Sequence, residues 1–234
     1  MSLPKLRTEL RKKGDPKKAR LLQRFFKTGP GEYAEGDVFV GVMVPVLREI
    51  SRKYQGLPFD EVLRFLRSRI HEERLLSLLI LIIKYRAAGL PEKEKIYKAY
   101  LSNTAYINNW DLVDVTAKYI VGGFLKDKSR APLYTLARSR SLWERRIAVL
   151  ATFHFIAEND FADALKIAEI LVADPHDLMH KAVGWMLREI GKKDVAAEEA
   201  FLKKHYTMMP RTMLRYAIER FPERKRQAYL CGRA

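Results

Sequence analysis

The run LLSLLILII at residues 75–83 is apolar on every side except at Ser77. A helix that is apolar all round is covered by its neighbours, so this run predicts a buried helix inside a helical assembly. The run is far shorter than the roughly 20 residues that a membrane-spanning helix needs. The N-terminus carries no apolar leader, and we therefore expect a cytoplasmic protein without a membrane segment.

Further helices are marked by capping residues or by a proline in the first turn: Pro91, Asn108 or Asn109, Ser141 with Glu144, Asp174 before Pro175, and Pro222. The spacing of Ser141 and Glu144 is that of a capping box, in which Glu144 reaches back to the start of the helix. Residues 38–44 (VFVGVMV) are ambiguous, because their β-branched content favours a strand whereas Gly41 and the following Pro45 disfavour one.

The three tryptophans are 33 and 42 residues apart, and a charged residue follows each by three or four positions: Trp110 with Asp114, Trp143 with Arg146, and Trp185 with Arg188. Helical repeats of the HEAT type have a period of roughly 40–47 residues, and stacked repeats bring equivalent positions onto one concave surface. No low-complexity linker interrupts the chain. We predict an all-α fold of HEAT-like repeats that form a curved superhelix, as one domain over residues 1–234.

The chain has a net charge of +16, and its basic residues gather near both ends. Such clusters favour phosphate backbones, because binding releases counterions. The expected phosphate contacts include Lys12, Lys13, Lys17, Lys18 and the basic residues from Arg211 onward. A basic but merely soluble protein is the alternative. An anionic membrane is a poorer match, because no helix clearly combines a basic face with an exposed apolar one.

Three segments resemble the AlkD-type DNA alkylation repair family, the HEAT-like-repeat DNA glycosylases: NWDLVD at 109–114, LWERRIA at 142–148 and KAVGWMLRE at 181–189. Residues 26–29 (FKTG) and the stretch from Gly36 to Arg48 are also similar, so the resemblance runs from about residue 16 to about residue 220. It implies an all-α superhelix with a basic concave face. It also implies excision of positively charged N3- or N7-alkylated purines from duplex DNA.

By this resemblance, Asp114 is the catalytic carboxylate, Trp110 and Trp185 face the lesion nucleotide, and Arg146 contacts the DNA beside it. The resemblance and the charge pattern together suggest further DNA contacts: Phe25, Lys27, Arg48, His154 and Arg188. Two of these positions depart from the family. Phe25 stands where the family has a tyrosine, and His154 where it has a lysine, so lesion preference and DNA contacts are more affected than the chemistry.

A cationic alkylpurine is already a good leaving group, so the enzyme needs no general acid. A fixed carboxylate would stabilise the oxocarbenium-like sugar electrostatically, and a nearby arginine would favour its ionised form. Each tryptophan face is worth about 0.5–2 kcal/mol toward a cationic base. We expect no cofactor and no metal, because His176 and His180 stand four apart without the Glu of a metalloprotease motif or a Cys/His cluster. Cys231, the single cysteine, suggests no catalytic role.

Each candidate also has a structural interpretation. Trp110 and Trp185 could be core residues, as large aromatics at helical spacing usually are. Asp114 and Arg146 could join neighbouring helices, and Arg188 could pair with Glu189. Asp111 favours its helix N-terminus, and Trp143 is core or groove wall. The sequence thus predicts a monomeric DNA-alkylpurine glycosylase, with a noncatalytic scaffold or binder of damaged or branched DNA as the alternative.

Overall fold

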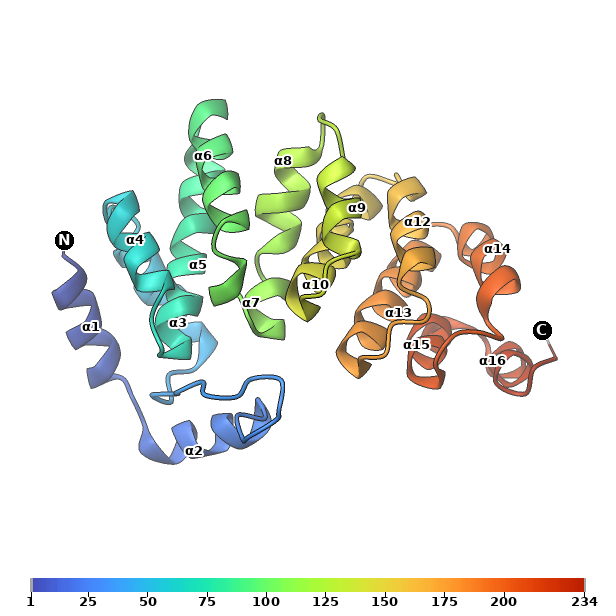
Figure 1. Ribbon diagram of the computed structural model, residues 1–234, viewed down its shortest axis with the longest axis horizontal. Helices are drawn as coiled ribbons and strands as arrows, with labels where there is room; N and C mark the ends of the chain where they lie inside the picture. The colour runs from blue at the N-terminus through green and yellow to red at the C-terminus, as the bar shows by residue number, and fades with distance from the viewer. Residues whose placement is uncertain (1, 234) are drawn as a thin grey trace. The chain divides into compact units, whose positions relative to one another are not determined.

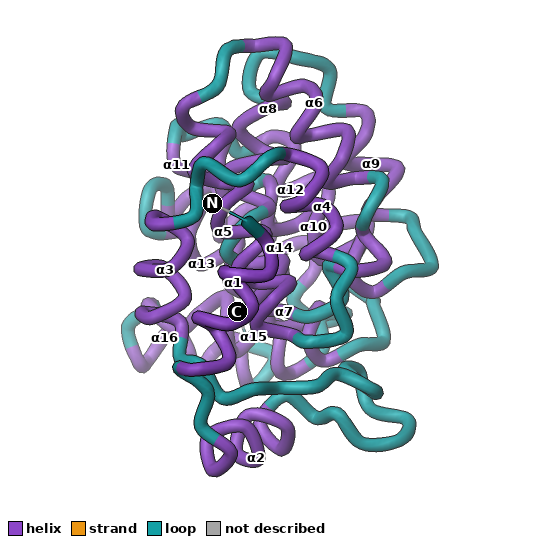
Figure 2. The backbone as a smooth tube through the Cα atoms, turned by 90° about the vertical axis from the view of Figure 1, so that its left-hand side faces the viewer, coloured by secondary structure: helices purple, strands orange, loops and turns teal. Residues whose placement is uncertain are grey.

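The computed structural model describes residues 2–233, which contain helices and loops but no strand (Figures 1 and 2). The chain forms two compact units, Met1–Leu112 and Val113–Ala234. No helix among the described residues is long and apolar enough to cross a membrane.

Unit 1 is built around one central helix, α5 (His71–Ala87), against which α3, α4 and α6 pack (Figure 1). Its elements are α1 (Leu3–Lys12), α2 (Pro16–Phe25), α3 (Val44–Lys53), α4 (Phe59–Leu66), α5, α6 (Leu90–Leu101), the 3-10 turn Thr104–Tyr106 and the start of α7 (Trp110–Asp114). The apolar run lies in α5, and all of it except Ile83 is buried, which confirms the first prediction. Ser77 fits into this core because its hydroxyl donates to the Val62 carbonyl at 2.7 Å.

The ambiguous segment 38–44 is a loop with one parallel bridge, between Val38 and Ile70. The amides of Val40, Gly41 and Val42 donate to the carboxylate of Glu72 in α5, at 2.8–3.3 Å. A side chain therefore accepts the hydrogen bonds that a neighbouring strand would otherwise accept. Gly41 has φ +84° and lies against the backbone of Asp15, a conformation that disfavours any residue with a side chain.

Unit 2 consists of further helices (Figure 1): the π-helix η2 (Lys118–Gly122), α8 (Gly123–Leu125), α9 (Ala131–Ala137), α10 (Leu142–Ala151), α11 (Phe153–Ala157), α12 (Ala162–Ile170), α13 (Asp177–Gly191), α14 (Val195–His205), α15 (Arg211–Ala217), the 3-10 turn Ile218–Arg220 and α16 (Glu223–Leu230). Helix α10 packs against α9, α13 and η2, and α13 packs against α14 and α15. At Gly122, a Cβ atom would overlap the carbonyl oxygen of Ala151, so only glycine allows η2 to lie this close to α10.

The predicted helix starts are largely confirmed. Helices α6 and α16 begin at their proline signals, and Asn109 Oδ1 accepts the Trp110 amide at 2.8 Å. Ser141 caps α10.

The carboxylate of Glu144 accepts the Ser139 hydroxyl, and that hydroxyl in turn accepts the Ser141 amide. Glu144 therefore reaches the start of the helix through the Ser139 hydroxyl and not by a direct hydrogen bond from the Ser141 amide.

The start predicted at Asp174 is wrong. Helix α13 begins at Asp177, with the side chain of His176 as its cap. The Asp174 carboxylate is occupied elsewhere, because it accepts from Arg145 Nε and from the His176 amide. Asp174 thus binds one distant residue and one local amide, but the helix itself begins three residues later.

Candidate functional site

The centre of the candidate site in unit 2 is the ion pair between Asp114 and Arg146. Arg146 Nε donates to Asp114 Oδ1 at 2.8 Å and its Nη2 donates to Oδ2 at 2.7 Å. The remaining nitrogen, Nη1, donates to the Leu178 carbonyl in α13 at 2.5 Å. The Arg146 side chain is only 5% exposed, whereas that of Asp114 is 16% exposed. The arginine is thus fixed inside the protein, and it holds a partly accessible carboxylate in one orientation.

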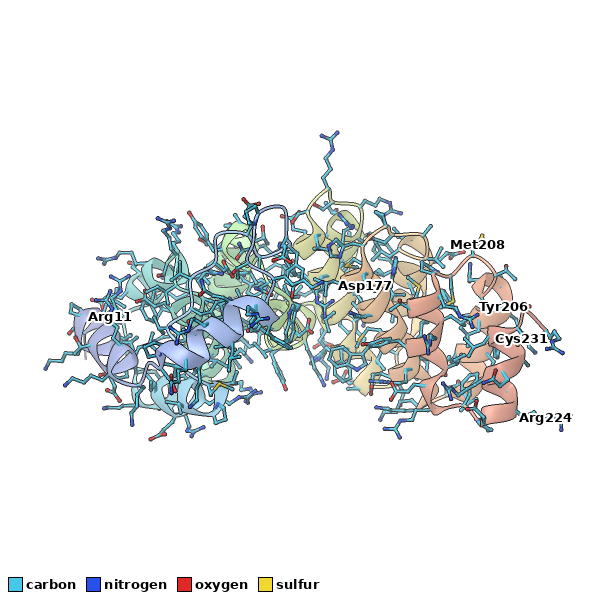
Figure 3. The ribbon with its side chains drawn as sticks, turned by 90° about the horizontal axis from the view of Figure 1, so that it is seen from below. Arg11, Asp177, Tyr206, Met208, Arg224 and Cys231 are labelled. Carbon is cyan, nitrogen blue, oxygen red and sulfur yellow. The ribbon has the colours of Figure 1, made fainter. Side chains whose placement is uncertain are left out.

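Trp185 lies on α13 and is half-buried. Its indole Nε1 donates to Glu189 Oε1 at 3.0 Å, and its ring meets Phe153 edge-to-face at 5.7 Å between centroids. The hydrogen bond and the ring contact together hold the indole. Helix α13 carries both Trp185 and the Leu178 carbonyl that anchors Arg146, so one helix positions two predicted site residues. Its first residue, Asp177, is labelled in Figure 3.

Trp110 belongs to an aromatic stack in unit 1. Its ring stacks on Phe26 at 5.1 Å, and Phe26 stacks in turn on Phe39 at 5.0 Å. Phe25 meets the indole edge-on at 5.9 Å and is 64% exposed. Trp110 itself is half-buried, so the indole is neither a sealed core residue nor a loosely held surface one.

Beneath this stack lies a buried polar network that the sequence analysis did not identify. His71 is 1% exposed and stacks on Phe39 at 4.5 Å. Its Nδ1 lies 3.1 Å from Asp37 Oδ2 and its Nε2 lies 2.8 Å from Asp111 Oδ2. Arg74 donates to both oxygens of Asp37 at 2.7 Å. Asp111, expected only to favour its helix N-terminus, is therefore the partner of a buried histidine.

The network sets the charge of its members. Burial lowers the pKa of His71, but the charge of Asp111 and the hydrogen bonds to Asp111 and Asp37 outweigh it and raise this pKa to about 8. Burial raises the pKa of Asp37, but the hydrogen bond from His71 and the charge of Arg74 outweigh it and hold the pKa below its usual value. His71 is therefore a buried imidazolium between two carboxylates at neutral pH.

The family of the chain follows from comparison with known proteins. The model of the DNA alkylation repair enzyme family matches residues 6–221. The chain belongs to this family. A search of curated protein sequences finds no match.

Solved structures with the same fold have low sequence identity to this chain. A protein of Enterococcus faecalis, described as a predicted DNA alkylation repair enzyme, is 16% identical over 90% of this chain and 98% of its own, with a TM-score of 0.69. AlkD2 from Streptococcus mutans is 16% identical over 88% and 97%, with a TM-score of 0.56. The protein smu.31 from Streptococcus mutans UA159 is 18% identical over 77% and 93%, with a TM-score of 0.54. At these identities the likeness concerns the fold, and it confirms the predicted all-α class.

The other predicted DNA contacts differ in how available their charges are. Arg48 and Lys27 are exposed, and Lys27 has a φ of +52° at the turn after α2. Arg188 pairs with Glu219 and with Glu189, so its charge is already compensated within unit 2. Burial, together with nearby cations, lowers the pKa of His154, which leaves this side chain neutral at pH 7.

The remaining candidates have structural surroundings. Trp143 is buried and belongs to the core of unit 2. His180 Nε2 contacts the Asp174 carbonyl at 2.5 Å, and His176 caps α13. Among residues 2–233, no group of three or more His, Cys, Asp or Glu could hold a metal ion. Cys231 is exposed after α16 (Figure 3).

Proposed function

We propose that this protein is a DNA glycosylase that releases cationic N3- or N7-alkylated purines from duplex DNA. The observation that carries the proposal is the partly accessible Asp114 carboxylate, fixed by two hydrogen bonds from a buried arginine. It occurs in a strongly basic chain of the DNA alkylation repair enzyme family. In this proposal the chain acts as a cytoplasmic monomer.

Asp114 would stabilise positive charge on the sugar and would not need to abstract a proton as a strong base. The adjoining guanidinium favours the ionised carboxylate, and an ionised carboxylate stabilises positive charge that develops on the sugar. The pair is already formed, so no reorganisation is needed when that charge appears.

The reaction is a hydrolysis. The bond between C1′ and the purine nitrogen breaks, and its electron pair leaves with the base, which becomes neutral. Water then adds its oxygen to C1′ and releases a proton to Asp114 or to solvent. Because the base carries its positive charge before the bond breaks, a general acid is not required.

The tryptophans would favour the damaged base. Trp110 and Trp185 each offer part of a ring face, and an aromatic face attracts a cationic purine more than a neutral one. The expected contribution is about 0.5–2 kcal/mol for each ring. This selectivity for charge is separate from the electrostatic role of Asp114, so tryptophan variants and Asp114 variants should affect different kinetic constants.

The test compares two neighbouring ion pairs. Asp114→Asn keeps the shape of the carboxylate but removes its charge, and release of 7-methylguanine and 3-methyladenine from a methylated duplex should fall at least 100-fold, or about 3 kcal/mol. The control is Asp174→Asn, because Asp174 accepts from Arg145, the residue next to Arg146, at 2.6 Å and is 3% exposed. Folded Asp174→Asn protein should release base at the wild-type rate.

Binding is measured in parallel by fluorescence anisotropy with an unmodified duplex. Undiminished release by Asp114→Asn would remove Asp114 from the mechanism. Tight binding by the wild-type protein without release of any methylated base would reject the glycosylase and favour a noncatalytic binder of damaged DNA.

A further inference from the structure

Lys118 lies in an unusual place beside the candidate site. It is the first residue of the π-helix η2, four positions after Asp114, and it is half-buried. Its Nζ lies 3.8 Å from the centroid of the Phe153 ring. π-Helical turns are rare and often occur at functional sites. Because η2 packs closely against α10 and α11, the core fixes the backbone of this lysine.

The Phe153 ring connects Lys118 with the rest of the candidate site. The same ring meets Trp185 at 5.7 Å, so the lysine and the tryptophan rest on one phenylalanine. Phe153 follows Arg146 by seven residues, which is about two helical turns and therefore the same side of the α10–α11 segment. Lys118 thus belongs to the group formed by Asp114, Arg146 and Trp185.

The charge of Lys118 is not neutralised by an acidic neighbour. Other cations of unit 2 do have acidic partners: Lys126 with Glu158, Lys181 with Asp177, Lys192 with Glu189, and Arg188 with Glu219. Lys118 forms no ion pair within residues 2–233 and instead lies over a ring. A cation held over an aromatic face keeps N–H groups on its outer side, and an anion could accept from them.

We propose that Lys118 binds a backbone phosphate oxygen of duplex DNA next to the nucleotide that is cleaved at Asp114. Burial lowers the pKa of His154, so this half-buried histidine is neutral at pH 7 and supplies no positive charge. Lys118 and His154 are neighbours, since the lysine charge acts on the histidine. The cation is therefore supplied from η2 instead of α11. This inference rests on the proposed function, because it assumes that Asp114 faces a nucleotide.

Salt dependence separates a phosphate contact from a merely structural lysine. Each phosphate neutralised contributes about 0.9 to the slope of log K against log salt. Lys118→Ala and Lys118→Gln should each lower the slope by this amount. The loss of affinity relative to wild type should then be about 3.5-fold larger at about 50 mM salt than at about 200 mM salt. Lys118→Arg should retain the wild-type slope.

The matched control is Lys126→Ala, which removes the same charge from a lysine of unit 2 that already pairs with Glu158 at 2.6 Å. Its slope should equal that of the wild type. Circular dichroism and thermal unfolding identify any variant that is not folded.

If folded Lys118→Ala and Lys118→Gln have the wild-type slope while the wild-type protein releases methylated bases, this inference is wrong and the proposed function stands. If the slope falls as expected but the wild-type protein releases no base, the phosphate contact stands and the glycosylase proposal fails.

Discussion

The buried imidazolium of His71 should make the stability of the protein depend on pH. Its folded-state pKa is about 8, above the ordinary 6.5, so folding favours the protonated form. The stabilisation is complete below the unfolded-state pKa and is lost as pH rises through the folded-state value. A shift of 1.5 pKa units at about 1.36 kcal/mol each corresponds to about 2 kcal/mol. The charged groups that face His71 are Asp37, Asp111 and Arg74.

The perturbation is His71→Gln, and the assay is urea unfolding followed by far-ultraviolet circular dichroism at about pH 6 and about pH 9. The variant should be less stable at both values, because it leaves a gap in the network. The difference in unfolding free energy between wild type and variant should be about 2 kcal/mol larger at the lower pH.

His154→Gln is the control. Burial lowers the pKa of His154, so its contribution to stability is present at higher pH and is lost only as pH falls through the folded-state pKa, below 6.5. From about pH 9 to about pH 6, its difference from wild type should therefore stay level or become smaller, whereas the His71→Gln difference should become larger. If the His71→Gln difference does not become larger from about pH 9 to about pH 6, His71 is not a buried imidazolium and the reasoning fails.

Three further predictions concern unit 2. Burial raises the pKa of Glu198 to about 8. The carboxyl therefore stays protonated in the folded protein at pH 7, whereas it ionises in the unfolded chain above about pH 4.5. Glu198→Gln should thus increase the unfolding free energy at pH 7 by up to about 3 kcal/mol and by much less near pH 4.5; urea unfolding checks this, and an equal effect at both pH values would contradict it. Gly122→Ala should destabilise the protein by about 1–3 kcal/mol through overlap with the Ala151 carbonyl, which would appear as a lower urea midpoint, and an unchanged midpoint would argue against the close packing of η2. Trp185→Leu should raise KM for a methylated duplex by about 2–30-fold with a smaller change in kcat; an effect on kcat alone would show that the indole does not bind the damaged base in the ground state.

Local patterns in the sequence predicted the helices but not the polar network. The run at 75–83 and the Asn109 cap depend on neighbours in sequence, and both were confirmed. The stretch from His71 to Arg74 consists of four consecutive polar residues, a pattern typical of an exposed first turn. All four are buried, because each has a partner far away in sequence, such as Asp37 for His71 and Arg7 for Glu73. The sequence feature that could have indicated this network is the charged first turn of α5, which leads directly into the apolar run at 75–83.

Two adjacent arginines show that the candidate site, like the polar network, could not be predicted from local sequence patterns alone. Arg145 and Arg146 look alike in the sequence, and each binds an aspartate about 30 residues away, Asp174 and Asp114 respectively. Successive helical residues point about 100° apart, so the two arginines reach different partners. Asp174 is 3% exposed and also accepts the amide of the residue that caps α13, whereas Asp114 is 16% exposed. Only the tertiary structure separates the enclosed carboxylate from the partly accessible one.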